Sequence, residues 1–434
     1  MSAATRNFLL FLAVGALIVT TGLTQSWNAA LAIVNMGLIS AVMALGVNIQ
    51  WGYAGLHNVG TMGFVALGGL ATVLVALDPV PGAWQSGGLR IMAALVFGAL
   101  VIAAAAWLYK RLPTAKWRIA ALAPLLIAGF VIYRVILDPA VAAVEAINPA
   151  LQGNLGGLGL PVLLSWPVGG LLAAGAGWLI GKTALGLRSD YLAIATLGIA
   201  EIVIAVLKNE DWLDRGVKNV IDIPRSVPYE IDLQASQSFL SFASSIGADP
   251  AAASAVVVKL LYAGLFLLVL VGLIWLSQAA LHSPWGRMMR AIRDNEVAAA
   301  AMGKDVTRRH LQVFVLGCAV LGISGAMLAT LEGQLTPGAF QPLRFTFLIW
   351  VMVVVGGSGS NLGAVLGGFL IWYLWVQVEP WGNSLMRLAT SGLADGSALK
   401  QHLLNSAAHM RLLVMGVILI VVLRFRPQGL IPGK

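Results

Sequence analysis

The stretch W-G-R-M-M-R-A-I-R-D-N-E-V-A-A-A-A-M-G-K-D-V-T-R-R-H, from Trp285 to His310, is a long charged interruption between two strongly apolar segments. Apolar residues make up 59% of the 434-residue chain, so a charged segment of this length is expected to lie outside the lipid. It contains six Arg or Lys residues and three acids. Because cytoplasmic loops of membrane proteins are enriched in Lys and Arg, the segment is predicted to lie on the cytoplasmic face.

A short helix with both ends marked lies inside this segment. Asn295 can cap its N-terminus, Glu296 suits the first turn, an alanine run follows, and Gly303 can adopt the left-handed C-cap conformation. Small side chains let the backbone of a partner approach closely, and flanking arginines can pair with carboxylates on that partner. The pattern favours a docking helix, and an ordinary solvated loop is the alternative that composition leaves open.

Apolar stretches of about 16 to 20 residues recur along the chain, and each is long enough to cross a hydrocarbon core. The sequence therefore predicts an all-α, polytopic transmembrane helical bundle of about 12 spans with broken, glycine-rich helices. Thr346–Val355 is too short to span alone, so its helix is expected to begin before Arg344. The expected spans are Phe8–Leu23, Leu31–Gln50, Gly60–Leu77, Ile91–Tyr109, Ile119–Leu137, Leu163–Gly181, Tyr191–Leu207, Val257–Ser277, Leu311–Leu331, Thr346–Val355, Leu362–Val376 and Arg411–Arg424.

The distribution of charge predicts the topology. With both termini in the cytoplasm, the cytoplasmic loops hold 16 of the 27 Lys and Arg residues but only 4 of the 18 acids. This asymmetry agrees with the positive-inside rule. The net charge of +9 is spread over separate loops without interleaved aromatic residues, so anionic lipid explains it more simply than nucleic acid. We expect a multi-pass membrane protein that binds lipid and no nucleic acid.

Several motifs resemble the LivM-type permease subunits of branched-chain amino-acid ABC importers, over roughly residues 31 to 75 and 160 to 434. The charged stretch matches the cytoplasmic coupling segment of that family, G-R-x-x-R-A-I-R-[DE]-x-E-x-A-A-x-A-x-G. The matching residues are Gly286, Arg287, Arg290, Ala291, Ile292, Arg293, Asp294, Glu296, Ala298, Ala299, Ala301 and Gly303. Further similar blocks begin at Trp51 (W-G-Y-A-G-L), Leu187 (L-R-S-D-Y-L-A-I-A-T-L-G-I-A-E-I), Val354 (V-V-G-G-S-G-S) and Arg426 (R-P-Q-G-L).

The resemblance implies a permease subunit that forms a membrane pathway for branched-chain amino acids. It implies a second, LivH-like permease, two LivG- and LivF-like ATPase subunits that carry ATP and magnesium, and a periplasmic substrate-binding protein. The resemblance also implies location in the bacterial inner membrane, and it implies no cofactor in this chain. Contacts with the ATPases are expected from Arg287, Arg290, Arg293, Asp294, Glu296, Ala298, Ala299, Ala301 and Gly303.

Four parts of the chain follow from these patterns. Residues 1–30 form an N-terminal span, and residues 31–77 form the first helices that resemble the permease family. Residues 78–160 match the family poorly and are predicted to add peripheral spans. Residues 161–434 form the permease core, which includes the coupling segment 285–310. Long loops at Lys208–Pro250 and Glu379–His409 are expected on the far side, where short surface helices can meet a soluble partner.

The residues offer no energy source or catalytic site. The nearest approach to a phosphate-binding loop is A-G-W-L-I-G-K-T, where Ala176 replaces the required first glycine at the end of an apolar helix. The five histidines and the single Cys318 show no metal-ligand spacing. An enzyme is therefore the least favoured class, and ATP hydrolysis is expected on partner subunits.

Two glycine clusters interrupt apolar helices, one from Gly52 and one from Gly356. Broken helices expose backbone polar groups to a substrate in many transporters. We therefore list Tyr53, Asn58 and Gly60 as candidates for the transport pathway, with tight turns and close helix packing as the alternative. The second cluster lies at the expected cytoplasmic edge, where a turn is favoured.

Glu201 lies about ten residues into an expected span, and an acid at that depth is costly. It matches the Glu of the family motif L-G-x-x-E-I, and it is a candidate pathway residue. The alternative is a structural pair with a buried Arg or a hydrogen bond between packed helices.

Departures from the family weaken the prediction of substrate. Thr61-Met62-Gly63-Phe64 stands where many members have His-Ala-Ala-Phe, and residues 214–219 read D-R-G-V-K-N instead of T-G-G-x-x-G. A permease for urea or short amides is therefore an alternative. A secondary transporter driven by an ion gradient is another, although it gives no reason for a capped alanine helix in the cytoplasm.

Overall fold

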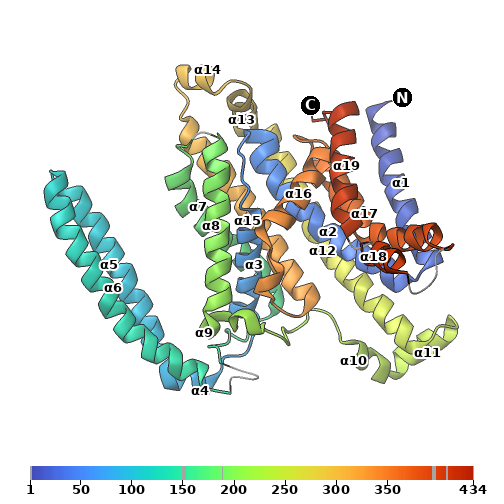
Figure 1. Ribbon diagram of the computed structural model, residues 1–434, viewed down its shortest axis with the longest axis horizontal. Coiled ribbons are helices and arrows are strands. Elements are labelled where there is room, and N and C mark those ends of the chain that lie inside the picture. Colours follow the sequence, from blue (N-terminus) through green and yellow to red (C-terminus); the bar gives the residue numbers. More distant parts are fainter. Residues whose placement is uncertain (1, 149–152, 188, 393–396, 407–408, 434) are drawn as a thin grey trace.

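The computed structural model describes residues 2–148, 153–187, 189–392, 397–406 and 409–433, which form an all-α bundle (Figure 1). Arg188, in one of the family-like blocks, lies outside the described residues. The α-helices are α1 (Ala3–Thr24), α2 (Trp27–Val47), α3 (Thr61–Ala76), α4 (Pro81–Ala83), α5 (Leu89–Arg111), α6 (Ala115–Glu145), α7 (Ser165–Ala184), α8 (Ser189–Asn209), α9 (Asp211–Asp214), α10 (Glu230–Ala235), α11 (Gln237–Ser245), α12 (Pro250–His282), α13 (Pro284–Asp294), α14 (Glu296–Ala301), α15 (Val306–Glu332), α16 (Pro342–Gly356), α17 (Asn361–Ala389), α18 (Ala398–Ser406) and α19 (Met410–Phe425). The π-helical segments are η1 (Asn48–Gly52) and η2 (Trp84–Gly88), and the 3₁₀ turns are η3 (Val162–Leu164), η4 (Gly216–Lys218) and η5 (Pro337–Ala339).

Each expected span coincides with a helix in the described part of the chain. Nine of the described helices are long and apolar enough to cross a membrane, and α18 with α19 forms a bent pair. The helices α3 and α16 are apolar but only 16 and 15 residues long, so the count of about 12 spans stays a prediction. As expected, the α16 helix begins before Arg344, at Pro342.

The end of α17 differs from the sequence expectation. A loop was expected from Glu379, but the helix continues through Pro380 to Ala389. Proline removes one backbone hydrogen bond from a helix, and Leu385, Met386 and Leu388 beyond it are good helix formers. The far-side loop at Lys208–Pro250 carries α9, α10 and α11, which are short helices of the expected kind.

The centre of the bundle is built by α2, α3, α7 and α15, which pack through glycine. A Cβ atom at Gly68 of α3 would lie 1.9 Å from the carbonyl oxygen of Gly322 in α15, and one at Gly322 would lie 2.3 Å from the carbonyl oxygen of Gly169 in α7. Only glycine allows helices to approach this closely. Within a lipid, where helix association depends on close packing, these contacts hold the core together.

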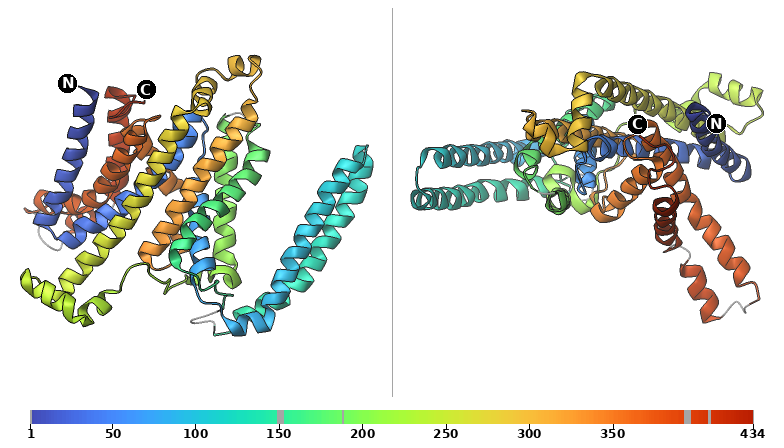
Figure 2. Two further views of the ribbon diagram at one scale, coloured as in Figure 1. Left: turned by 180° about the vertical axis from the view of Figure 1, so that it is seen from behind. Right: turned by 90° about the horizontal axis from the view of Figure 1, so that it is seen from above.

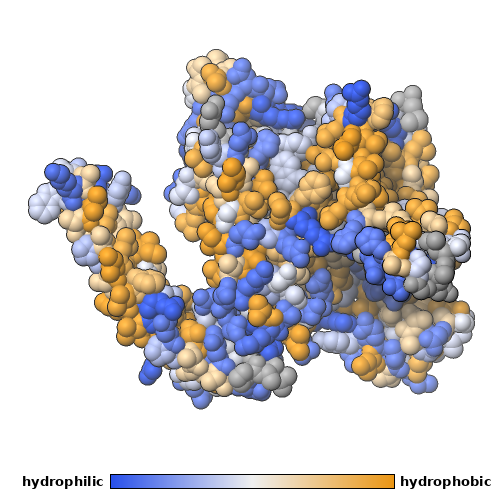
Figure 3. Space-filling view, in the orientation of Figure 1, coloured by the Kyte–Doolittle hydropathy of each residue, from blue (hydrophilic) through white to orange (hydrophobic). Residues whose placement is uncertain are grey.

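The α5–α6 hairpin stands away from the bundle as an arm (Figures 1 and 2). Its two helices pack on each other, with Val101 against Gly129 and Tyr133 against Gly98. The arm joins the bundle at its base, where the indole of Trp84 donates a hydrogen bond to the Leu155 carbonyl oxygen at 3.0 Å. Apolar side chains cover most of its surface (Figure 3), which suits direct contact with lipid.

The two ends of the bundle carry different elements. The described N- and C-terminal segments lie at the same end as α13 and α14, and α4, α9, α10 and α11 lie at the other (Figure 1). The turn between α5 and α6 and the turn between α7 and α8 also lie at the α14 end. The loops that the sequence analysis assigns to one side of the membrane are therefore gathered at one end of the molecule.

Candidate functional site

Helix α13 lies on the bundle through one apolar face. Its first residue, Pro284, follows the Ser283 N-cap, whose hydroxyl accepts a hydrogen bond from the Gly286 amide at 3.4 Å. Met289 and Ile292 are buried, each three residues from the previous buried position. This spacing places them on one side of a helix, while the arginines at 287 and 290 point to solvent.

Helix α14 follows as a short, capped knob. The Asn295 side chain accepts a hydrogen bond from the Ala298 amide at 2.9 Å, and Gly303 has a φ of +77°. Both ends of the helix are therefore as the sequence predicts. Because Gly303 has open space where a side chain would begin, its role in the structure is conformational.

The surface of the knob is apolar at its tip and charged at its sides. Val297 and Met302 are each 80% exposed, and the sequence analysis did not single them out. The sequence feature that could have identified them is their position, as the two larger apolar residues on either side of the alanine run. Large apolar side chains exposed on a polar end indicate an interaction surface. The expected contact residues Arg287, Arg290, Arg293, Asp294, Glu296, Ala298, Ala301 and Gly303 are exposed, and Ala299 is half-buried.

Arg293 also reaches back to the bundle. Its guanidinium donates a hydrogen bond to the carbonyl oxygen of Gly52, at the end of η1. The same group lies against the turn between α16 and α17, because a Cβ atom at Gly359 would lie 2.9 Å from the Arg293 Nη1. One side chain of the charged segment thus contacts both glycine-rich breaks.

The two helix breaks, at η1 and at the turn between α16 and α17, are also joined by hydrogen bonds. The Asn48 side chain donates to the Asn361 Oδ1 at 3.2 Å and accepts from the Gly359 amide at 2.8 Å. Tyr53 donates its hydroxyl proton to the same Asn361 oxygen at 3.0 Å. A side chain at Gly52 would meet the Gly359 amide nitrogen at 2.6 Å, so glycine is required for this approach.

Asn58 lies inside the bundle in a hydrogen-bonded chain. Its side-chain amide donates a hydrogen bond to the Gln50 side chain at 2.9 Å, and its side-chain oxygen accepts one from the Gly60 backbone amide at 3.0 Å. Its backbone carbonyl accepts a hydrogen bond from the Trp350 indole at 3.2 Å. Gln50 in turn donates to the Phe314 carbonyl of α15 at 2.9 Å. The structure therefore places Asn58 among structural partners that hold the loop between η1 and α3.

This loop contacts α8 directly. The Val59 amide donates to the Thr196 hydroxyl at 3.1 Å, and a Cβ atom at Gly60 would lie 2.1 Å from the Thr196 carbonyl oxygen. The break at η1 is therefore followed by a loop that packs closely on α8.

Glu201 lies on the exposed face of α8, one helical turn beyond this contact. It shares that face with Ile194, Gly198, Ile202 and Val206, at a spacing that repeats with the helical turn. Within the described ranges of the chain, its carboxylate has no ion-pair partner. The predicted alternative of a buried Arg pair is not present among these residues.

Other site chemistry is not seen in the residues that the structure describes. They contain no group of three or more His, Cys, Asp or Glu side chains that could hold a metal ion. Cys318 is buried, and its sulfur accepts a hydrogen bond from Gln50 at 3.3 Å.

A bundle of long apolar helices, with a capped polar segment at one end, is the architecture of a multi-pass membrane protein. The chain belongs to the family described as "Branched-chain amino acid transport system / permease component", whose pattern matches residues 140–423. It is a multi-pass inner-membrane protein. The match includes α7 to α18 and most of α19, and it leaves out α1 to α5 and most of α6.

Curated relatives carry the same description. The chain is 28% identical over 293 residues to the high-affinity branched-chain amino acid transport system permease protein LivM of Salmonella typhimurium and to that of Escherichia coli. It is 26% identical over 297 residues to a probable LivM of Methanocaldococcus jannaschii. These alignments cover 67% of this chain, and 61% of the first two relatives and 74% of the third. No solved structure matches the chain.

Proposed function

We propose that this chain is a permease subunit of an ATP-driven importer, and that it forms part of the membrane pathway for branched-chain amino acids. It works with a second, LivH-like permease, two LivG- and LivF-like ATPase subunits and a periplasmic substrate-binding protein. The observation that carries the proposal is the α14 knob together with Arg293, which connects it to both helix breaks. The names of the relatives supply the substrate class.

The knob has the features of a docking site for an ATPase subunit. Val297 and Met302 provide an apolar tip, the alanines provide a narrow body, and Arg287 and Arg290 can pair with acids around a groove. Apolar anchors at the centre of an interface supply most of its binding energy, and charges at its edge supply specificity. ATP and magnesium bind on the partner, which closes and moves the knob.

Movement of the knob reaches the pathway through contacts described above. Arg293 pulls on the break at Gly52 and on the turn at Gly359. The loop after Gly52 carries the movement to α8 at Thr196. The pathway opens and closes when α8, α16 and α17 shift together, which is a rigid-body gating motion.

Helix α8 faces the second permease. A carboxylate at mid-membrane costs about 2.5 to 3.5 kcal/mol when it meets lipid. Glu201 is exposed in the isolated chain. A second subunit with a polar or water-filled surface is therefore a better neighbour for that face of α8 than hydrocarbon. The pathway then lies between the two permeases, with Glu201 on its wall.

The orientation of the chain in the membrane follows from the same proposed assembly. The end that carries α14 and both described termini faces the cytoplasm, where the ATPases lie. The opposite end, where α9, α10 and α11 lie (Figure 1), faces the periplasmic binding protein.

Two substitutions in the knob test the proposal. Ala299→Arg places a long charged side chain where the groove requires a small one, and Gly303→Trp disrupts the left-handed end of the helix. Both variants are expected to assemble in the membrane but to lose most ATP-dependent uptake of leucine, isoleucine and valine. Ala115→Arg, at the same end of the molecule but in the turn of the arm, is the matched control and is expected to transport normally.

Unchanged uptake by both knob variants would contradict the proposal. Uptake that follows an ion gradient and continues after the ATPase subunits are deleted would favour a secondary transporter instead.

A further inference from the structure

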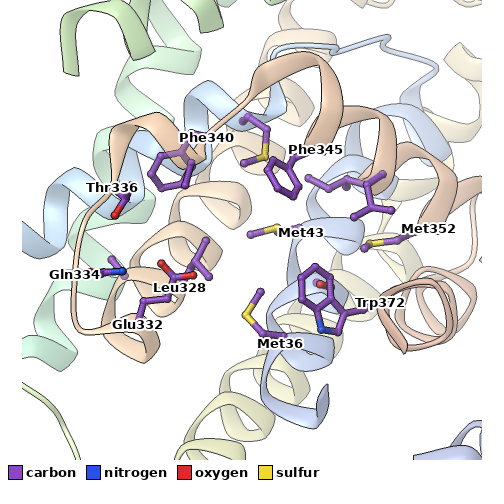
Figure 4. Close-up of a pocket in the computed structure, with 16 residues that line it drawn as sticks. Met36, Met43, Leu328, Glu332, Gln334, Thr336, Phe340, Phe345, Met352 and Trp372 are labelled. Atoms are coloured by element: carbon purple, nitrogen blue, oxygen red, sulfur yellow. The ribbon is translucent and has the colours of Figure 1, made fainter. Parts of the chain in front are cut away.

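A cavity of about 140 Å³ extends from the end of α15 into the bundle, between α2, α3, α16 and α17 (Figure 4). Its volume is about ten times the ~15 Å³ that admits one water molecule, so it can hold a small organic molecule. None of the contacts of the coupling segment reaches its walls. It is therefore a second feature of the fold, separate from the docking knob.

Most of the cavity wall is apolar and adaptable. Met36 and Met43 come from α2, Phe345 and Met352 from α16, and Trp372 from α17 (Figure 4). Methionine side chains are flexible and polarizable, so they fit aliphatic groups of different shape. The wall favours a ligand with a branched or unbranched hydrocarbon side chain over a sugar or an amide.

One end of the cavity is polar. Glu332, Gln334 and Thr336 lie together on one side of the cavity, opposite Trp372 (Figure 4). Glu332 is the last residue of α15, where the unpaired carbonyl groups of the helix already give a partial negative charge. In the part of the chain that the structure covers, Glu332 has no ion-pair partner. Glu332 and Gln334 are exposed, so the polar end is the mouth of the cavity, and a cation bound there would offset the negative charge of the helix end.

The polar end is anchored to the far-side loop. Leu335, next to Gln334, exchanges two backbone hydrogen bonds with Val220 at 2.9 and 3.0 Å, and the Ile223 amide donates to the Gly333 carbonyl at 3.0 Å. The loop that is expected to face a soluble partner thus holds the polar end of the cavity in place. A ligand released by such a partner would meet this end first.

We propose that the cavity is a binding site for one aliphatic amino acid within this subunit. The ammonium group of the ligand pairs with Glu332, and its carboxylate accepts hydrogen bonds from Gln334 and Thr336. Its side chain lies among Met36, Met43 and Trp372. The inference rests on the proposed function and deepens it, because it gives the substrate a site inside one permease in addition to the space between two.

Binding of tritiated L-leucine to the full chain in lipid nanodiscs tests the site. Isoamylamine, which keeps the ammonium and the branched side chain, is expected to compete with leucine. The compound 4-methylpentanoate, which lacks the ammonium, is expected not to compete. The absence of saturable leucine binding, or equal competition by both compounds, would overturn the proposal.

Substitution of Glu332 gives the second test. Glu332→Gln keeps the size of the side chain and removes its charge, so it is expected to weaken leucine binding by at least about 10-fold. Glu145→Gln, at the same end of the molecule but in the arm, is the matched control and is expected to bind normally. Met36→Trp fills the apolar part and is expected to weaken leucine binding more than alanine binding. Unchanged leucine affinity in Glu332→Gln would overturn the site.

The site and the proposed function fail in different ways. If Glu332→Gln and Met36→Trp bind and transport leucine like the unchanged chain, the cavity site is wrong and the importer function stands. If the unchanged chain with its ATPases transports no aliphatic amino acid in cells, the proposed function is wrong as well.

Discussion

At the scale of single residues, Arg293 connects the coupling segment to the bundle. A guanidinium has five fixed N–H donors, so it can bind the Gly52 carbonyl and still lie against the turn at Gly359. The sequence placed Arg293 among the residues that contact an ATPase. Its contact with Gly52 was not predictable, because 241 residues separate the two and no local pattern relates them.

Removal of the hydrogen bond between Arg293 and Gly52 is expected to uncouple ATP hydrolysis from transport. Arg293→Ala is expected to leave the chain in the membrane with its ATPases bound, and to lower leucine uptake about 10-fold, because a charged hydrogen bond of about 1.5 to 3 kcal/mol is lost. Uptake and ATPase activity measured on the same membranes check this. Arg308→Ala, an exposed arginine of α15 that is not among the expected ATPase contacts, is the control and is expected to keep normal uptake. Equal loss of uptake in both variants would show that charge alone matters.

Asp214 makes the far-side loop sensitive to pH. It is fully buried, its Oδ1 accepts from the Gly216 amide at 3.2 Å, and its Oδ2 has no hydrogen-bond partner. Burial raises the pKa of Asp214 from 3.8 to about 7. The folded loop therefore holds a proton that the unfolded loop releases. Its stability is greatest below pH about 4, falls as the pH rises towards about 7, and is constant above that.

Hydrogen exchange of residues 210–223, corrected for the intrinsic rate, checks this expectation. Protection is expected to be lower at pH 8 than at pH 5.5 in the unchanged chain. Asp214→Asn stays neutral and is expected to show no such difference. A pH difference that persists in Asp214→Asn would assign it to another group.

At the scale of elements, local sequence signals predicted α14 correctly. The sequence carried no signal for contacts between elements that are distant in the chain. Asn295, the alanine run and Gly303 lie within nine residues, so the cap and the end of the helix follow from their own chemistry. The glycine clusters predicted breaks in the helices. They did not predict that the breaks meet through Asn48 and Asn361, because that contact depends on how α2 and α17 pack.

The N-cap of α14 is expected to affect docking. Asn295→Ala removes the acceptor for the Ala298 amide and costs about 1 kcal/mol of helix stability. A six-residue helix has little other support, so the knob is expected to unwind and to bind the ATPase more weakly. Hydrogen exchange of residues 296–302 and the amount of ATPase that co-purifies check both effects.

Asn295→Asp keeps the acceptor and is expected to restore the helix and the co-purification. If Asn295→Ala keeps full protection and full binding, the cap does not support docking.

At the scale of the whole molecule, composition and charge were sufficient for the fold class and for the grouping of loops at two ends. The all-α polytopic bundle is confirmed, and the family prediction is confirmed by the match over residues 140–423. The arm formed by α5 and α6 was predicted only as added spans, since apolar periodicity does not show which helices stay apart. The roles of the coupling residues and of Tyr53, Asn58, Gly60 and Glu201 stay predictions.

The exposed side of α8 that carries Glu201 is also a feature of the whole molecule. Glu201 is exposed on the surface of the described chain, and we propose that a second subunit covers it. The cavity at Glu332 and the face at Glu201 are separate parts of the molecule. We propose that the cavity binds a substrate inside the subunit and that the face at Glu201 lines a pathway beside it.

The most direct test of the account is a pull-down of the tagged chain from native membranes in mild detergent, with mass identification and an ATPase assay of the eluate. The account predicts a second permease and two ATP-hydrolysing subunits in the eluate, and loss of the ATP-hydrolysing subunits but not of the second permease from the Ala299→Arg variant. Recovery of the unchanged chain alone, also after crosslinking, would contradict it.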